Sequence, residues 1–153
     1  MKFSLPTKYE FADQWLHEAT KILSKKFEDL GHEVPKLRVL YGFSTNGFST
    51  IKKKMYRGEC LSRAWSANDE NIIFITPNTT DEVDVLTTLA HEIAHAIDDC
   101  KSLHGKNFKN LMTSYGYLYD DGFEFPSLKL MFEFQTISKD LGKFPSIKLA
   151  VNN

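Results

Sequence analysis

One short stretch of the chain combines residue types that could carry out metal-assisted chemistry. His91, Glu92 and His95 form a His-Glu-x-x-His pattern within an apolar segment. On a helix, residues four apart lie one turn apart on the same face, so both imidazoles can reach one metal ion. Glu92 lies beside them, where its carboxylate can accept a proton from a water on that metal instead of binding the metal. Because Zn²⁺ lowers the pKa of such a water towards ~7, the pattern predicts hydrolysis at a zinc centre.

The segment around this pattern has the features of a mostly buried helix. Apolar residues recur there at helical spacing, namely Val83, Leu86, Leu89, Ala90, Ile93, Ala94 and Ile97. A stripe of this width is typical of a helix that the rest of the fold covers. Thr79 and Glu82 match a capping box, which predicts the start of the helix. The alternative, a helix whose histidines merely face solvent or pack against a wall, fits this setting less well.

A catalytic zinc usually takes three protein ligands, so the chain should supply one more. His104 is the favoured third ligand, because the eight residues between it and His95 let the helix end and the chain turn back. Gly105 follows directly, and glycine allows the backbone to turn and approach closely. Three of the five histidines therefore fall within fourteen residues of one another.

Four other residues compete with His104 for this place. Glu124 and Glu133 lie far enough downstream for a second helix to supply a carboxylate ligand. Asp98 shares the face of the two motif histidines, but its spacing suits a hydrogen bond to a ligand imidazole from outside the metal shell. Cys100 would make a softer site, although a thiol at this position is more simply explained as a packed side chain.

The remaining chain predicts the elements that would position the site. Three further apolar stripes predict helices over residues 7–30, 105–115 and 127–141. Short apolar or alternating runs predict strands over residues 37–43, 60–66 and 72–75. The last two strands should pair as a hairpin across the turn at 68–71, whereas residues 117–126 are interpreted as an aromatic, acidic connection. A strand beside the motif helix could bind an extended peptide along its edge.

Composition limits the class of protein. With 153 residues, 42% of them hydrophobic, the chain is expected to fold as a single domain over residues 1–153. It shows neither the apolar run of a signal peptide nor a stretch of about 20 apolar residues, which predicts a cytoplasmic protein without a membrane partner. Its two cysteines, Cys60 and Cys100, are too few for a disulfide framework and are expected to be reduced thiols.

A basic, polar segment at residues 44–58 suggests a second kind of partner. Lys52, Lys53, Lys54 and Arg57 could contact phosphates while Tyr56 or Phe48 stacks on a base, which would give DNA binding. The opposing interpretation is a solvated loop without a partner. The formal net charge of −1 argues against a chain that coats nucleic acid.

The motif and its surroundings resemble a known family. His91-Glu92-Ile93-Ala94-His95, followed after eight residues by His104-Gly105-Lys106-Asn107-Phe108, resembles the SprT-like zinc metallopeptidases, in particular the small forms common in bacteriophages. Three other segments also look like that group, namely 60–66, 73–77 and 141–145. Together the similarity covers residues 35–149. The resemblance implies an α+β, zincin-like fold in which a small β-sheet packs against the active-site helix and further helices.

The same resemblance implies the function. It assigns Zn²⁺ to His91, His95 and His104, and it makes Glu92 the general base and acid of a metalloendopeptidase that cleaves protein substrates. Some members of the family cleave proteins trapped on DNA, and many carry a cysteine-rich zinc ribbon that this sequence lacks. If a phage encodes the chain, its location is the host cytoplasm.

Two matters stay open at this level. The stabiliser of the tetrahedral oxyanion is not identified; the conceivable residues, each better explained by a structural role, are Arg63, Tyr115, Tyr117 and Tyr119. The alternative function is a DNA- or protein-binding module that keeps the zinc site for stability and does not cleave proteins.

Overall fold

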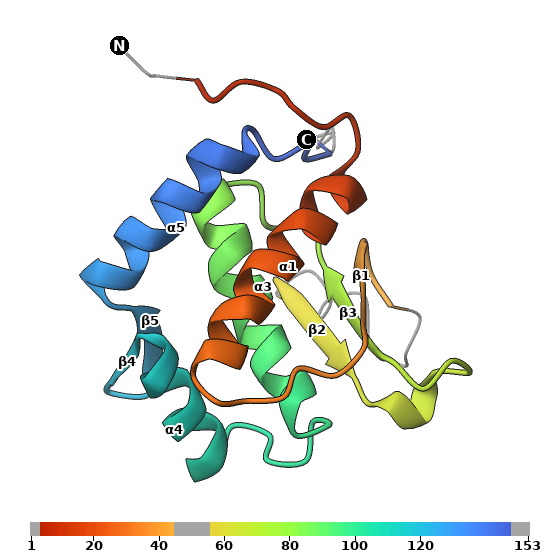
Figure 1. The fold of residues 1–153 in the computed structure, drawn as a ribbon, viewed down its shortest axis with the longest axis vertical. Helices are drawn as coiled ribbons and strands as arrows, with labels where there is room; N and C mark the ends of the chain where they lie inside the picture. Colours follow the sequence, from red (N-terminus) through yellow and green to blue (C-terminus); the bar gives the residue numbers. More distant parts are fainter. Residues whose placement is uncertain (1–3, 45–55, 148–153) are drawn as a thin grey trace, which may run out of the picture.

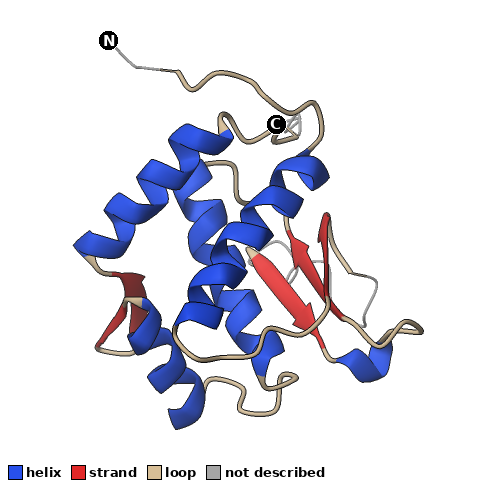
Figure 2. Ribbon diagram, viewed as in Figure 1, coloured by secondary structure: helices blue, strands red, loops and turns tan. Residues whose placement is uncertain are grey.

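The computed structural model describes residues 4–44 and 56–147, which form a mixed α+β fold (Figure 1, Figure 2). The helices are α1 (Ala12–Asp29), α3 (Glu82–Ile97), α4 (Lys106–Tyr115), α5 (Leu128–Leu141) and the short 3₁₀ helix η1 (Arg63–Trp65). The strands are β1 (Leu37–Tyr41), β2 (Gly58–Leu61), β3 (Asn71–Ile75), β4 (Tyr117–Asp120) and β5 (Phe123–Pro126). The predicted α+β class is therefore confirmed. None of the described helices has the length and apolar character needed to cross a bilayer.

Three strands form a small sheet in the order β1-β3-β2. β3 lies in the middle, parallel to β1 and antiparallel to β2, so the predicted pairing of the second and third strands is confirmed. Alternate β3 residues, including Ile73 and Ile75, are fully buried, as expected for a sheet with one face on the core. Among the described strands, β2 has a partner on one side only, which places it at an edge of the sheet.

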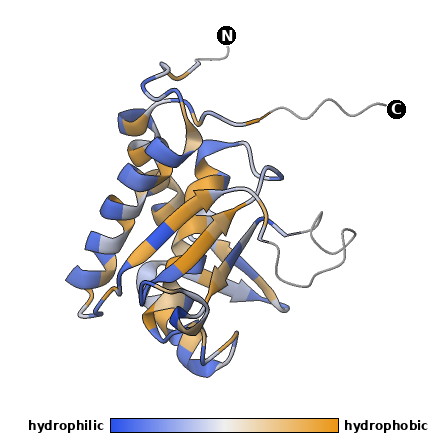
Figure 3. Cartoon of the chain, turned by 90° about the vertical axis from the view of Figure 1, so that its right-hand side faces the viewer, coloured by the Kyte–Doolittle hydropathy of each residue, from blue (hydrophilic) through white to orange (hydrophobic). Residues whose placement is uncertain are grey.

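Helix α3 is the centre of the fold. It contacts α1, α4, α5 and the two strands β2 and β3, and it passes between the sheet and the β4–β5 hairpin (Figure 1). Leu86, Leu89 and Ile93 are fully buried in the core that these elements share. Figure 3 shows the hydrophobic segments gathered where strands and helices meet, with hydrophilic turns outside. The motif helix is thus stabilised mainly by burial of its apolar sides.

The start of α3 differs from the predicted capping box. The N-cap residue is Asp81, whose Oδ1 accepts hydrogen bonds from the backbone N–H of Val83 (3.0 Å) and Asp84 (3.1 Å). Thr79 is buried two residues earlier. Glu82 instead accepts a hydrogen bond from Phe144 N at 2.8 Å, which attaches the segment after α5 to the start of α3. Aspartate caps a helix at least as well as threonine does, so Thr79 and Asp81, two residues apart, are competing N-cap candidates.

Two other segments also differ from the prediction. The strand expected over residues 60–66 ends at Leu61, because Ser62 caps η1 by accepting a hydrogen bond from Ala64 N (3.3 Å). Residues 117–126 form the β4–β5 hairpin instead of an irregular connection. Its turn is Asp121-Gly122, with φ of +47° and +79°. An Asp-Gly pair between alternating aromatic residues is a hairpin signal, so the sequence did contain this element.

The loop after α3 is fixed to the sheet by one carboxylate. Oδ1 of Asp99 accepts hydrogen bonds from Arg63 N (2.8 Å) and Asn71 Nδ2 (2.9 Å), and Oδ2 accepts one from Ser62 Oγ (3.1 Å). The hydrogen bond from the Arg63 backbone, with those from Asn71 and Ser62, lowers the pKa of Asp99. Asp99 has a φ of +56°, a conformation that a non-glycine residue keeps only when its surroundings hold it.

We expect Asp99→Asn to lower the free energy of unfolding by about 1–2 kcal/mol at neutral pH, because it weakens charge-assisted hydrogen bonds. The folded-state pKa of Asp99 is depressed, so its contribution is complete above the unfolded pKa of about 3.9 and is lost as pH falls through the folded value. Urea denaturation at neutral and at acidic pH measures both effects.

The matched control is Asp140→Asn, which changes an exposed carboxylate on α5. It should leave stability nearly unchanged at both pH values. A stability difference between wild type and Asp99→Asn that persists unchanged in acid would contradict the assigned role of the Asp99 charge.

Candidate metal centre

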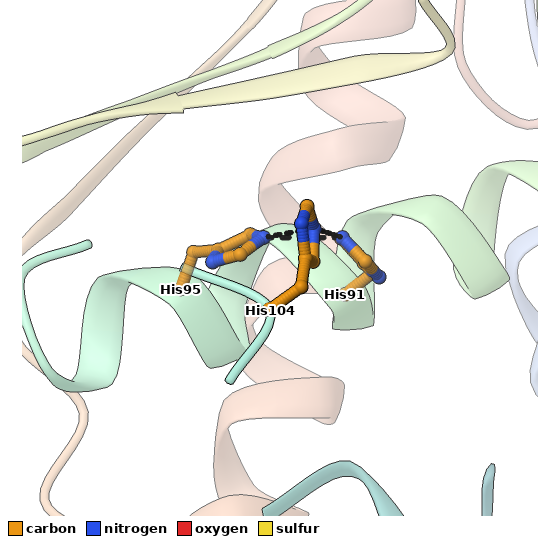
Figure 4. Close-up of side chains that lie close together, drawn as sticks. All are labelled: His91, His95 and His104. Carbon is orange, nitrogen blue, oxygen red and sulfur yellow. Dashed lines mark hydrogen bonds between the residues drawn. The ribbon is translucent and has the colours of Figure 1, made fainter. Parts of the chain in front are cut away.

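Three histidines bring their Nε2 atoms together at one point. His91 and His95 come from adjacent turns of α3, and His104 comes from the loop before α4 (Figure 4). The Nε2–Nε2 distances are 3.1 Å between His91 and His95, 3.1 Å between His95 and His104, and 3.4 Å between His91 and His104. Within the described part of the chain, these residues form a group that could hold a metal ion.

The size of this triangle fits a tetrahedral metal ion. Zinc–imidazole bonds of about 2.0–2.1 Å place two nitrogens of a tetrahedral site about 3.3 Å apart. The three observed separations lie close to that value. A cation would also satisfy three nitrogen lone pairs that otherwise face one another. Three imidazoles that leave a fourth position for water are one of the donor sets that catalytic zinc sites use.

The electrostatic setting favours neutral imidazoles, which are the form that binds metal. Burial lowers the pKa of His95 to about 3, and the neighbouring His91 and His104 lower it further. Burial and His91 lower the pKa of His104 as well. At neutral pH these two rings are therefore uncharged and free to offer a lone pair.

Glu124 on β5 orients the first of the three rings. Its Oε1 lies 2.6 Å from Nδ1 of His91, and its Oε2 accepts a hydrogen bond of 2.5 Å from the Tyr119 hydroxyl. Burial, the largest single effect, lowers the pKa of His91, but the hydrogen bond that Nδ1 donates to Glu124 and the charges of Glu92 and Glu124 together outweigh it, so the pKa of His91 is raised. A proton on Nδ1 leaves the Nε2 lone pair pointing at the other two histidines.

The structure thus separates the residues that compete for the third place. His104 joins the two motif histidines, whereas Glu124 contacts His91 from the side opposite the cluster. Glu133 lies on α5 and forms an ion pair of 2.6 Å with Lys26. The orienting role predicted for Asp98 belongs to Glu124, because Asp98 Oδ2 accepts a hydrogen bond from Ser102 N (2.9 Å). The sequence indicates only a connection over residues 117–126. The position of Glu124 beside His91 depends on the β4–β5 hairpin that these residues form.

Phe108 on α4 covers the cluster from the side of the core. Its ring stacks on His95 at a centroid distance of 4.2 Å and lies edge-on to His91 at 5.0 Å and His104 at 5.3 Å. Phe108 is 3% exposed and belongs to the hydrophobic core. Its contacts with all three rings restrict their rotation, which preorganises the nitrogens.

Glu92 lies on the floor of a cleft of about 360 Å³ that includes the three histidines, Gly58 to Cys60 of β2, Tyr56, Cys100 and Leu103. Its side chain is 6% exposed, and burial raises the pKa of Glu92 to about 7, against the lowering effect of His91. A carboxyl group with a pKa close to neutral can both take and return a proton. The position predicted for the general base is therefore beside the histidines and within the cleft.

Gly58 allows β2 to pass directly over Glu92. A Cβ atom at this position would lie 2.7 Å from Cγ2 of Thr88, 3.1 Å from Cγ of Glu92 and 3.2 Å from its Oε1. Only glycine leaves room for this approach without moving the strand or the carboxylate. In the sequence Gly58 ends the polar segment 44–58, and no local signal distinguishes a glycine needed for space from one needed for a turn.

Several other predicted residues are structural or untested. Tyr115 and Tyr117 are buried, and the Tyr117 hydroxyl donates to Thr87 O (2.7 Å). Arg63 lies beside Asp99, and Tyr119 donates to Glu124, so neither is positioned as a dedicated oxyanion donor. Arg57 is exposed. Tyr56 is exposed as well, and the other residues of the predicted DNA contact lie outside the described residues: Phe48, Lys52, Lys53 and Lys54.

A larger groove of about 830 Å³ lies between α1 and α5, away from the histidines. Apolar side chains such as Ile22, Leu128 and Phe132 line it, with the Lys26–Glu133 pair at its rim. The residues that line the groove include neither a group of metal ligands nor a buried general base, so the candidate site is the smaller cleft.

The chain matches no protein-family model, and neither a curated protein nor a solved structure is detectably similar to it. The assignment of the site therefore depends on the arrangement of its side chains.

Replacing Gly58 tests the close approach of β2 to α3. Gly58→Ala should lower stability by about 1–3 kcal/mol, since the new methyl group overpacks the contact with Thr88. Thr88→Ser removes Cγ2, so the double variant should recover part of this loss in a double-mutant cycle measured by urea denaturation. Equal losses in the single and double variants would contradict the steric explanation.

Metal content distinguishes the ligand candidates. Wild type should keep about one Zn²⁺ per chain after dialysis, and His104→Ala should lose most of it. Glu124→Ala should keep the stoichiometry but bind zinc about 10–100-fold more weakly, because it frees the ring of His91. Chelator competition and elemental analysis measure both quantities.

Glu133→Ala is the matched control, since it removes a glutamate that is distant from the histidines. It should bind zinc like wild type. Full zinc retention in His104→Ala would show that the third ligand is another residue.

Proposed function

We propose that this chain is a zinc-dependent metalloendopeptidase of the SprT-like, zincin-like type. The observation that carries the proposal is the triangle of imidazole nitrogens next to a buried glutamate, in a cleft bordered by an edge strand. His91, His95 and His104 would hold the ion. Zn²⁺ in this place would act as a Lewis acid, lowering the pKa of a water and polarising a carbonyl.

Glu92 would perform the proton transfers. Its carboxylate lies one residue from His91 and within the same cleft, so a water beside the histidines is within its reach. It would accept the proton of the attacking water and then donate it to the leaving amine. Because burial keeps bulk water from the carboxylate, its proton affinity is close to that needed at neutral pH.

The substrate would be an extended stretch of protein backbone. β2 is the strand that lines the cleft, and among the described strands its outer edge has no partner. A peptide could add to that edge through main-chain hydrogen bonds, which would place one of its carbonyls near the histidines. Such binding recognises the peptide backbone more than the side chains, which fits cleavage of unfolded proteins at many different sequences.

A single substitution separates catalysis from metal binding. Glu92→Gln should retain zinc, because the three imidazoles are unchanged, and should lower the rate of protein cleavage by about 100-fold or more. A denatured protein, assayed by fragment release with and without single-stranded DNA, is the substrate to use. The DNA arm tests whether proteolysis depends on nucleic acid.

The competing function is a zinc-stabilised binding module without proteolytic activity. It would be supported if zinc-loaded wild type cleaved no protein in either arm while zinc removal lowered its thermal stability. Equal cleavage rates for wild type and Glu92→Gln would instead exclude the assigned role of Glu92.

A further inference from the structure

The two cysteines of the chain lie together beside the candidate metal centre. Cys60 is on β2, and Cys100 is in the loop after α3, forty residues further along the chain. Their Sγ atoms are 3.5 Å apart, and Cys100 Sγ is also 3.6 Å from the backbone oxygen of Cys60. Both side chains are partly exposed and line the cleft, so a small reagent can reach them.

The backbone holds each cysteine in place independently. Cys60 pairs with Ile73 in the β2–β3 ladder, which fixes its side chain towards α3. Cys100 has a φ of +63°, and its N–H donates to His95 O at 2.8 Å. The carboxylate of the preceding residue, Asp99, attaches this loop to the end of β2 through Ser62 and Arg63. The sulfurs therefore meet because of the fold.

We propose that Cys60 and Cys100 form a redox-reactive dithiol that a low-molecular-weight disulfide such as oxidised glutathione converts into an intramolecular disulfide. One thiolate attacks the reagent, forming a mixed disulfide and releasing one reduced glutathione. The second thiolate attacks the protein sulfur of that mixed disulfide and releases the other glutathione. Two protein thiols are oxidised, one reagent disulfide is reduced, and both protons leave with the two glutathione thiols.

The approach that the second step requires is small. A covalent S–S distance of about 2.05 Å lies about 1.5 Å below the present separation, so the two Sγ atoms need to approach by only that amount. Reaction with a second molecule of glutathione competes poorly, because the partner thiol is already in contact. The disulfide would close a loop of about 40 residues and raise the thermal unfolding midpoint by about 10 °C.

Oxidation would also act on the metal centre, a consequence that rests on the proposed function. The crosslink would join the β2 wall of the cleft to the loop that carries His104 four residues further on. Since that loop must move for His104 to leave the cluster, the oxidised protein should release zinc more slowly than the reduced one.

Reduced full-length protein is incubated with oxidised glutathione, and its free thiols and intact mass are measured. Wild type should lose both thiols and two hydrogen atoms, with no glutathione retained, and its unfolding midpoint should rise. Cys60→Ser and Cys100→Ser are matched controls that should each retain one glutathione. The proposal would be overturned if wild type kept glutathione or formed a covalent dimer. It would also be overturned if wild type stayed reduced under conditions in which the single variants react.

Zinc release to a chelator is then compared between oxidised and reduced wild type, with Cys60→Ser in both conditions as the control. Slower release only from oxidised wild type supports the link to His104, and equal release overturns that link. If the protein binds no zinc but the intramolecular disulfide still forms, the proposed function fails and the dithiol stands.

Discussion

The burial of α3 is the constraint on which the rest of the structure depends. Its apolar sides contact the sheet and the other helices, so the helix cannot rotate without exposing part of the core. That fixed orientation presents His91, Glu92 and His95 along the one side that faces the cleft. A surface helix of low stability could carry the same sequence motif and still let the two imidazoles point apart. The geometry of the site is thus a result of packing energy.

The charge balance of the cleft gives a separate reason to expect a cation there. Glu92 is buried, and the nearby charge of Glu124 adds to the effect of burial in raising the pKa of Glu92, while His95 and His104 are held neutral. Two carboxylates in a poorly solvated place are costly unless positive charge lies near them. One divalent ion between the three imidazoles would offset both. The cleft therefore combines imidazole donors at its centre with the carboxylates of Glu92 and Glu124 beside them.

How much of the fold and of the candidate site the sequence predicts depends on how far apart in the chain the interacting residues lie. The motif helix, its apolar stripe and the return of the chain at His104 follow from spacing along one segment, and the structure brings these histidines together. The contact of Glu124 with His91 joins residues 33 apart across a hairpin whose Asp121-Gly122 turn was overlooked. Gly58 and Asp99 act through contacts with other elements, which no local pattern encodes.

The stacking of Phe108 beneath the histidines has a consequence for the order of events. Because this ring covers the core side of the cluster, the open approach to the three nitrogens is from the side of the cleft, where His104 is exposed. In the proposed peptidase, water, substrate and product would then share one approach. A cleaved product that stays in place would block the next water, so turnover at this centre would be strictly sequential, with product departure preceding each new hydration.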